Sequence, residues 1–408
     1  MKRTHLYYIL SVAISCCMVG GLLNSQLIIV ERTPQGTVSM GRELLLYSWG
    51  VFVYALGSLS LSWLSDKYGR VRCIGVVTLV LTILHGILGW NLLGSYKVWH
   101  LFLYWGVFNI CLSIFFTAVE GLLSEYQDHR IPLARRLGAY CLSWCAGNAL
   151  GSFITGYTKE RSGAHTVYRV LFILCLAAFL AVLLDWRRHG SSRLGHHAVD
   201  HKDIRPDTLF YTMLGRIGLF FSCLVWGALA SSFPRFGRDF HHLSEGGIGN
   251  LLGTIFFTNL MVFLWFPFWK KWQYNAPLQI ALQSATPAGL ILAIFTPSGS
   301  ILLLRIAFVL IGIGWSISYF FSIYYSLMVP TDHAKSGGLH EGFLSLGSLS
   351  GSLAVIGLIP LAAKMNLIDP ERLGAVALLT GFLGMILSLY IQTALLKRRQ
   401  KRIVPDAY

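Results

Sequence analysis

One carboxylic acid, Glu120, lies within a long apolar stretch and is accompanied by a row of amide and hydroxyl side chains. The row recurs at intervals of three or four residues and consists of Asn109, Ser113, Thr117, Glu120 and Ser124. Since an α-helix has about 3.6 residues per turn, these side chains share one face of the helix expected over 99–125. A buried carboxylate is costly while it is charged, so it takes up a proton more readily than it does in water. We therefore expect the row to face a watery cavity, with Glu120 as a proton carrier or as a structural partner of basic groups.

Other polar side chains also fall inside apolar segments, where an ionisable or amide group is a candidate for binding a solute. Arg216 suits an anionic group or a carboxylate counter-charge, or else its long side chain reaches back to the polar surface. Arg305 enters its segment only shallowly, which favours reaching the surface, and Glu341 opens its segment and complements the positive end of a helix. The candidate proton or solute site comprises Glu120, Asn109, Arg216, Asn259, Arg305 and Tyr319. For Tyr319 and its aromatic neighbours, packing is the alternative to solute contact.

No arrangement typical of an enzyme active site is found in the sequence. The loops contain no pair of nucleophile and base, and no phosphate-binding glycine loop followed by Lys-Ser or Lys-Thr is present, so ATP use has no support. Cys141 and Cys145 share a helix face, and histidines recur within 196–201, but packing and a solvated linker are the favoured interpretations. All eight cysteines lie in or beside apolar runs, which predicts no disulfides. We expect no enzymatic activity, no catalytic residue, no metal site and no bound cofactor.

The composition is that of a membrane protein. Of the 408 residues, 55% are hydrophobic and only 12% are charged, and the mean hydropathy is +0.60. Soluble proteins carry about 25% charged residues. This composition excludes a soluble enzyme, a secreted domain and a nucleic-acid-binding module, so the net charge of +15 does not indicate a nucleic acid partner. The lipid bilayer is the expected environment.

Apolar runs between charged or Pro/Gly-rich breaks are each long enough to cross a bilayer, which takes about 20 residues per helix. They predict twelve transmembrane helices at 6–30, 43–64, 73–94, 99–125, 134–157, 168–185, 208–232, 246–266, 276–295, 299–328, 337–361 and 372–396. The first run is longer than the core of a signal peptide, which favours a membrane helix. The basic stretch 186–207 divides the chain into an N-terminal six-helix lobe at 1–185 and a C-terminal six-helix lobe at 208–396. A basic tail follows at 397–408.

An internal repeat supports this division into an all-α protein with two pseudo-symmetric lobes. Three glycines of the helix expected over 134–157, Gly138, Gly147 and Gly151, are followed 200 residues later by Gly338, Gly347 and Gly351. The two helices hold the same place in the order of their lobes. Transporters built from two repeats enclose a site near the middle of the membrane.

The distribution of basic residues predicts the orientation of the chain in the membrane. Lys and Arg are about twice as frequent in the segments on the side of the two termini as in the segments on the other side. Cytoplasmic loops carry such an excess. We therefore expect both termini and the linker 186–207 in the cytoplasm, and the protein in the plasma membrane or inner membrane of the cell.

The loop after the second expected helix reads Ser65-Asp66-Lys67-Tyr68-Gly69-Arg70-Val71-Arg72. It resembles the signature loop of the major facilitator superfamily, Gly-x-x-x-Asp-x-x-Gly-Arg-Arg/Lys, with Asp66, Gly69 and Arg70 in register. Ser62 replaces the leading glycine. The resemblance implies a twelve-helix transporter in which one lobe rocks against the other. In such proteins the loop acts as a cytoplasmic latch, and Glu125 and Arg136 resemble its partners at the ends of the next helix hairpin.

The glycines Gly138, Gly147 and Gly151 also resemble the motif of antiporters in the same superfamily, although Ser152 stands where that motif has proline. Glycines at this spacing equally serve close packing of membrane helices. The resemblance implies a secondary active transporter of small solutes, driven by a proton gradient, with efflux favoured over uptake. A sugar or organic-anion importer of the same fold is the first alternative, and a non-transporting membrane scaffold is the second. We expect a monomer with a small-molecule substrate.

Overall fold

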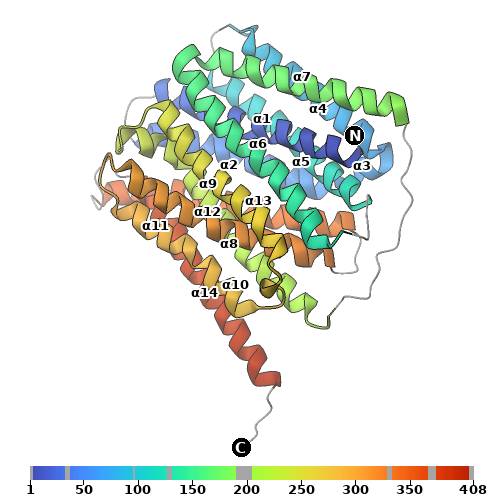
Figure 1. Cartoon of the computed structure of the whole chain (residues 1–408). Helices are drawn as coiled ribbons and strands as arrows, with labels where there is room; N and C mark the ends of the chain where they lie inside the picture. The colour runs from blue at the N-terminus through green and yellow to red at the C-terminus, as the bar shows by residue number, and fades with distance from the viewer. Residues whose placement is uncertain are drawn as a thin grey trace, which may run out of the picture.

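The computed structural model describes residues 3–32, 37–94, 97–125, 131–189, 205–328, 333–365 and 374–403, and in these ranges all regular structure is helical (Figure 1). Within them, side chains are described except at 37–40, 62, 123–125, 333–338 and 401–403. The helices are α1 (Arg3–Arg32), α2 (Thr37–Ser60), α3 (Ser62–Tyr68), α4 (Arg70–Gly89), α5 (Val98–Glu125), α6 (Leu133–Ser162), α7 (Ala164–His189), α8 (Thr208–Asp239), α9 (Glu245–Trp265), η2 (Phe266–Phe268), η3 (Lys270–Trp272), α10 (Ala276–Gln283), α11 (Ala285–Phe295), α12 (Ile301–Met328), α13 (His333–Lys364) and α14 (Ala375–Ile403).

The predicted all-α membrane fold is confirmed. Among the described residues, 11 segments are long and apolar enough to cross a membrane, with α10 and α11 forming one of them. Helix α6 is 30 residues long, and the glycine, serine and asparagine residues along its middle make it less apolar than the other long helices. It packs between α1 and α9, and its polar side chains therefore face other helices instead of lipid. Together with α6, the 11 segments agree with the expected twelve crossings.

Two expected helices are divided in the structure. The segment expected over 43–64 ends as α2 at Ser60, and the short helix α3 then leads into the signature loop. The segment expected over 276–295 is interrupted at Ser284, between α10 and α11. The reason for the second break is Pro287, which has no N–H to donate to the carbonyl group four residues earlier.

The repeated glycines occupy equivalent positions in the two halves of the chain. A Cβ atom added to Gly147 or Gly151 would overlap backbone carbonyl oxygens of α1. A Cβ atom added to Gly347 or Gly351 would likewise overlap backbone carbonyl oxygens of α8. In each half, the fifth membrane helix therefore lies directly on the first, at a distance that only glycine allows. Gly138 has a different role, because it packs on Pro267 of the other half.

We expect the substitution Gly351→Ala to lower the thermal stability of the purified protein. The added methyl group meets the backbone of α8, which cannot yield as a flexible side chain would, and overpacking of this kind costs about 1–3 kcal/mol. Gly357→Ala is the matched control on the same helix, because nothing lies within 4 Å of its Cβ position. Thermal unfolding in detergent should show a lower Tm for Gly351→Ala alone, and equal Tm values for the two variants would contradict this packing.

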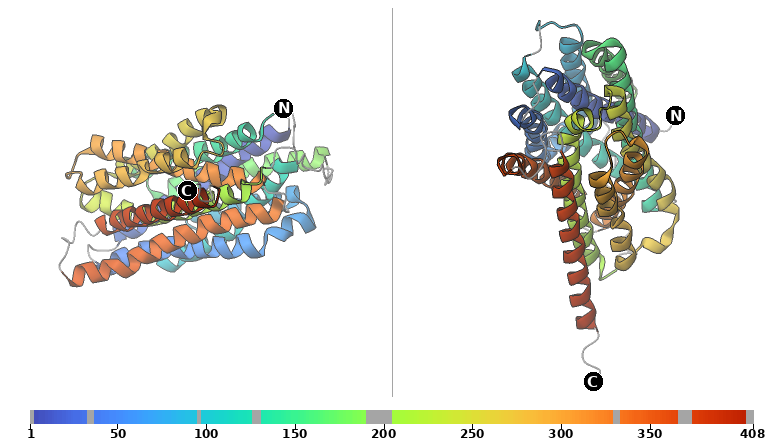
Figure 2. Two further views of the ribbon diagram at one scale, coloured as in Figure 1. Left: turned by 90° about the horizontal axis from the view of Figure 1, so that it is seen from below. Right: turned by 90° about the vertical axis from the view of Figure 1, so that its left-hand side faces the viewer.

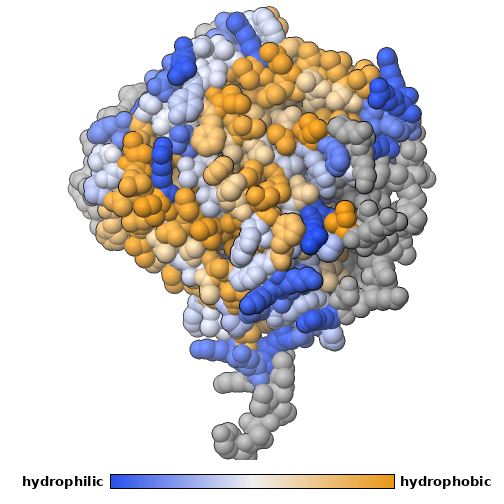
Figure 3. All heavy atoms as spheres, in the orientation of Figure 1, coloured by the Kyte–Doolittle hydropathy of each residue, from blue (hydrophilic) through white to orange (hydrophobic). Residues whose placement is uncertain are grey.

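The helices form one bundle in which α1 begins at the right of Figure 1 and α14 ends at the bottom, and both ends lie on one side of the bundle (Figures 1 and 2). We call this side the terminal face and the other end of the bundle the opposite face. The two halves of the chain join along α6 with α9 and along α2 with α13. Hydrophobic residues cover much of the visible flank (Figure 3). Phe295, Leu302 and Tyr390 are 79%, 71% and 71% exposed, as lipid contact requires.

Candidate functional site

The central feature of the bundle is a pair of carboxyl groups, one from each half of the chain. The side chains of Glu120 of α5 and Glu341 of α13 face each other and interact across the two halves. The side chain of Glu341 is 4% exposed, and that of Glu120 is partly buried. Glu341 lies in the third turn of α13, which begins at His333, so the prediction that it complements a helix end is wrong.

Two tyrosines complete the carboxyl pair. The Tyr54 hydroxyl of α2 donates to Glu341 Oε2 over 2.7 Å, and the Tyr140 hydroxyl of α6 donates to Glu120 Oε1 over 3.0 Å. Each hydroxyl comes from the same half as Glu120. The bond from Tyr54 to Glu341 therefore also crosses between the halves. Four helices, α2, α5, α6 and α13, meet at these four side chains.

The contact between the two carboxyl groups requires a proton. Ionised carboxylates only accept hydrogen bonds, so two of them bond to each other only when one is protonated. Two ionised carboxylates at this distance also repel each other strongly in a buried site. Among the described residues, neither Glu120 nor Glu341 forms an ion pair with a basic side chain. A contact of this kind can hold one proton between the two halves.

The polar row on α5 packs more tightly than the sequence led us to expect. Asn109 is 5% exposed and Ser113 is 1% exposed, and both lie against glycines of α2, Gly50 and Gly57. Their side chains donate to carbonyl groups of their own helix, at 2.8 Å in each case. This part of the row faces a helix instead of a watery cavity, because the glycines of α2 allow a close approach. Among the described side chains of the row, Glu120, nearer the terminal face, reaches across the bundle, and the side chain of Ser124 lies outside the described residues.

Three other residues of the candidate site, Asn259, Tyr319 and Arg305, make their described contacts with residues other than Glu120 and Glu341. Asn259 is fully buried, and its amide lies 2.7 Å from Ser316 Oγ, which ties α9 to α12. Tyr319 stacks on Trp315 and lies 4.9 Å, between ring centroids, from Trp144 of the other half. Arg305 is exposed near the opposite face, where it donates to Asn250 over 3.2 Å.

The signature loop lies on the terminal face, between α3 and α4. Gly69 has φ +92, a conformation that L side chains rarely adopt. Arg70 and Asp66 form an ion pair of 3.0 Å within the loop, with 47% of the Asp66 side chain exposed. The Arg70 guanidinium lies beside Gly121 of α5, the residue after Glu120. The loop therefore borders the carboxyl pair, and the described contacts of Asp66 remain within its own half.

Two further residues were expected in the latch. Arg136 lies in the first turn of α6. Glu125 ends α5, and its side chain lies outside the described residues.

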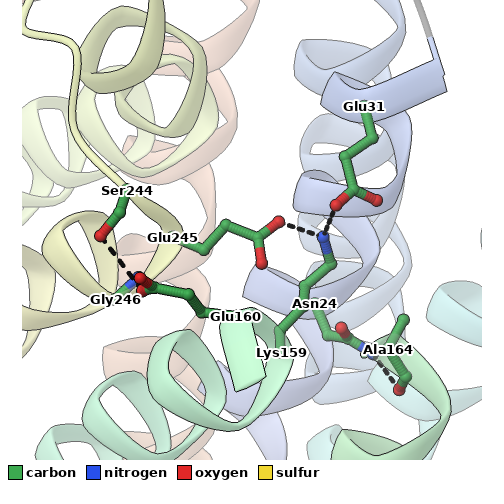
Figure 4. Close-up of polar contacts among 8 residues, drawn as sticks. All are labelled: Asn24, Glu31, Lys159, Glu160, Ala164, Ser244, Glu245 and Gly246. Carbon is green, nitrogen blue, oxygen red and sulfur yellow. Dashed lines mark hydrogen bonds and ion pairs between the residues drawn. The ribbon is translucent and has the colours of Figure 1, made fainter. Parts of the chain in front are cut away.

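A second polar network, which sequence reasoning missed, joins the two halves at the opposite face (Figure 4). Lys159 near the end of α6 is 4% exposed. It forms ion pairs with Glu31 at the end of α1, over 2.5 Å, and with Glu245 at the start of α9. The neighbouring Glu160 accepts a hydrogen bond of 2.8 Å from the backbone N–H of Gly246. Together these contacts fix the end of α6 to the first turn of α9.

A buried ion pair closes the same face between α2 of the first half and α8 of the second. Arg235 of α8 and Glu43 of α2 are 3% and 0% exposed, and the Arg235 Nε and Nη2 atoms lie 2.8 and 2.5 Å from Glu43 Oε1. Nearby, Gln26 of α1 donates to the carbonyl group of Ala230 over 2.9 Å. These contacts also cross between the halves. We call the set of Glu31, Lys159, Glu245, Glu43 and Arg235 the opposite-face network.

Ion pairs described on the terminal face stay within one half. Arg3 pairs with Asp185 over 2.9 Å in the first half, and Arg399 pairs with Asp207 in the second. The structure is thus closed at the opposite face by charged contacts between the halves. At the terminal side, the described contacts of polar groups between the halves include those of the carboxyl pair and Tyr54, and the Arg135 guanidinium 4.8 Å from the centroid of the Phe268 ring. The two halves are held together by different chemistry at the two faces.

The sequence contains little that identifies these partners in advance. The charges of the opposite-face network lie near helix ends, where isolated charges are ordinary. Lys159 and Glu245, like Glu120 and Glu341, are far apart in the chain, and no spacing rule connects them. The one available signal was that each of these charges falls within or beside an apolar run, where an ionisable residue is costly and usually has a partner.

A helical bundle that crosses the membrane about twelve times and joins two halves around buried ionisable groups has the architecture of a secondary transporter. The model of the Major Facilitator Superfamily matches residues 9–337, and the chain belongs to that superfamily. It is a multi-pass membrane transporter and not an enzyme. Among solved structures, the chain is similar in fold to the POT family transporter PepTSo, crystallised in meso, with a TM-score of 0.71 and 12% identity over 100% of both chains. A search of curated proteins finds no match.

Proposed function

We propose that the protein moves a small solute across the membrane in exchange for, or together with, protons, and that the Glu120–Glu341 pair carries the proton. The observation that carries this proposal is the contact between two carboxyl groups from opposite halves, one buried at Glu341 and one partly buried at Glu120. A scaffold without transport activity has no need of such a pair, because apolar side chains at both positions would pack without the cost of burying polar groups.

We infer that protonation of the carboxyl pair controls whether the two halves stay in contact near the terminal face. While the proton is present, the hydrogen bond joins α5 to α13 near the terminal face. When the proton leaves, two negative charges remain in contact with no described basic partner, and they push the halves apart there. Rocking the N-terminal half against the C-terminal half then requires that the opposite-face network holds. Reprotonation restores the contact and allows that network to open in its turn.

We infer that the terminal face is cytoplasmic, because the basic residues are about twice as frequent on this side. The membrane is then the plasma membrane or the inner membrane of a cell. The glycines that α6 shares with antiporters favour efflux in exchange for protons. Arg216, which has no carboxylate partner among the described residues, favours the alternative, an organic anion that moves together with a proton.

The test is proton movement in sealed vesicles. Purified protein in liposomes that contain a pH-sensitive dye is exposed to a panel of neutral, cationic and anionic small molecules without an imposed pH gradient. We expect at least one compound to change the internal pH only in vesicles that contain the protein, with the sign of the change distinguishing exchange from cotransport. If every compound that the protein transports, measured with labelled solutes, leaves the internal pH unchanged, proton coupling is contradicted.

A further inference from the structure

Arg216 of α8 is a partly buried cation without an ion pair among the described residues. Its Nε atom is buried and has no hydrogen-bond partner there. Its described contact is with the ring of Phe343 on α13, 5.7 Å from the guanidinium carbon to the ring centroid. A buried charge without a counter-charge is costly. The surroundings of Arg216 therefore favour the binding of an anion.

His340 is a second buried polar side chain that has no part in the Glu120–Glu341 pair, and it lies on α13 near Phe343. His340 is one turn before Phe343 on α13, so the two side chains share the face that meets α8. His340 is 1% exposed, and its Nδ1 atom lies 3.1 Å from Ser322 Oγ of α12. When the Ser322 hydroxyl donates to Nδ1, the neutral ring carries its proton on Nε2. That buried Nε2 has no hydrogen-bond partner among the described residues, and the ring lies within the electrostatic field of Arg216.

The nearby acidic group does not neutralise Arg216. Glu341 follows His340 in the chain, but its side chain lies on another face of α13, where it accepts from Tyr54 and contacts Glu120. Apolar surface is present on the other side of His340. Tyr319 lies edge-on to the imidazole at 5.0 Å between centroids and stacks on Trp315 at 5.5 Å. Two buried donors and an aromatic wall thus meet at the junction of α8, α12 and α13.

We propose that Arg216 and His340 bind the carboxylate group of the solute, so that the substrates are small organic acids. The guanidinium group offers paired donors that match a carboxylate, and the imidazole N–H supplies a further donor. Tyr319 and Trp315 then contact the apolar remainder of the acid. This inference rests on the proposed transport function for the fate of the ligand, but the binding itself does not depend on proton coupling.

The position of this site also relates it to the proton. A bound carboxylate beside His340, in the third turn of α13, places a negative charge close to the Glu120–Glu341 pair. A second negative charge on that pair is then disfavoured, so the pair keeps its proton while the acid is bound. Acid and proton therefore move together, and the direction of net movement follows the sum of their two gradients.

The experiment measures binding to the purified full-length protein in detergent by thermal stabilisation and calorimetry. The probes are acetate, lactate, succinate and benzoate, each compared with its neutral amide. We expect at least one acid to stabilise the wild-type protein while its amide does not. The result that overturns the site is stabilisation by none of the acids, or by an acid and its amide equally.

Variants then locate the site. Arg216→Gln and His340→Leu should each weaken binding of that acid about tenfold or more, the usual effect of losing a hydrogen bond to a charged group. Arg216→Lys keeps the charge and should retain part of the affinity, which keeps the test decisive if Arg216→Gln does not fold. Arg305→Gln is the matched control, because Arg305 is exposed near the opposite face. Undiminished binding by both Arg216 variants would overturn the assignment.

Two outcomes separate this site from the proposed function. If an acid binds at Arg216 but moves no protons in vesicles, the site stands and proton coupling fails. If proton movement is driven by neutral or cationic solutes and no acid binds, the proton-coupled function stands and the carboxylate site is refuted.

Discussion

Replacing Glu341 by glutamine is expected to abolish solute movement driven by a pH gradient, with a fall of at least about 100-fold in rate. Glutamine has the shape of a protonated glutamic acid and cannot release a proton at that position. Its amide still donates to Glu120, so α5 and α13 stay joined whatever the pH. Glu120→Gln should have the same effect through the other half of the pair, although the solute itself should still bind.

Two measurements check this expectation without knowledge of the substrate. Infrared difference spectra of the wild-type protein should contain a protonated carboxyl band that shifts on exchange into 2H2O, and the band should be missing or altered in both variants. Spin labels at Lys67 and Lys271, exposed on the terminal sides of the two halves, should separate as the pH rises only in the wild type. Cys73, which is not fully buried, is first replaced by serine.

The control variant is Asp207→Asn, which removes a carboxylate that is 48% exposed and paired with Arg399 at the surface. Surface ion pairs contribute about 0–1 kcal/mol, so this change should leave transport and the distances unaltered. Glu120→Gln or Glu341→Gln with wild-type proton movement would show that the pair is structural. In that case the proton site lies elsewhere in the bundle.

The second large effect is expected at the opposite face. Lys159→Met keeps the length of the side chain but leaves Glu31 and Glu245 without their shared cation. Lys159 is buried, whereas the Glu31 and Glu245 side chains are 52% and 22% exposed, so the loss should cost less than the roughly 3–5 kcal/mol typical of a fully buried pair. The opposite face should open, because the two carboxylates then repel each other across the interface between the halves.

Distance measurements on the opposite face provide the readout. Labels at Arg161 and His242, exposed residues of the two halves, should move apart in Lys159→Met relative to the wild type. A conformational equilibrium shifts about tenfold for each 1.4 kcal/mol, so even part of the lost energy should change the populations measurably.

The matched control for this prediction restores the net charge of −1 that Glu31, Lys159 and Glu245 have in the wild type, without restoring the contact. Adding Glu245→Gln to Lys159→Met removes the repulsion between the two carboxylates, and much of the closed population should return. If the single variant keeps the wild-type distances, the network does not hold the opposite face. If the double variant is as open as the single variant, repulsion between the carboxylates is not the cause.

The amino-acid sequence is enough to predict the membrane fold, because crossing a bilayer requires long apolar helices whose length and composition are visible along the chain. It also located the signature loop around Asp66 and Gly69, where a tight turn needs glycine. The repeat of Gly147 and Gly151 as Gly347 and Gly351 correctly marked two equivalent helices, since close helix packing leaves small residues at regular spacing. These features depend on local chemistry.

Only the tertiary structure decided which ionisable groups meet. Glu120 was recognised as unusual because it lies in an apolar run, but its partner Glu341 comes from the other half and was interpreted as a helix-end charge. Lys159 and Glu245 also lie on different halves and come together only at the interface. Contacts between residues far apart in the chain depend on how whole helices pack, and no pattern along one helix records the partner that packing brings to it.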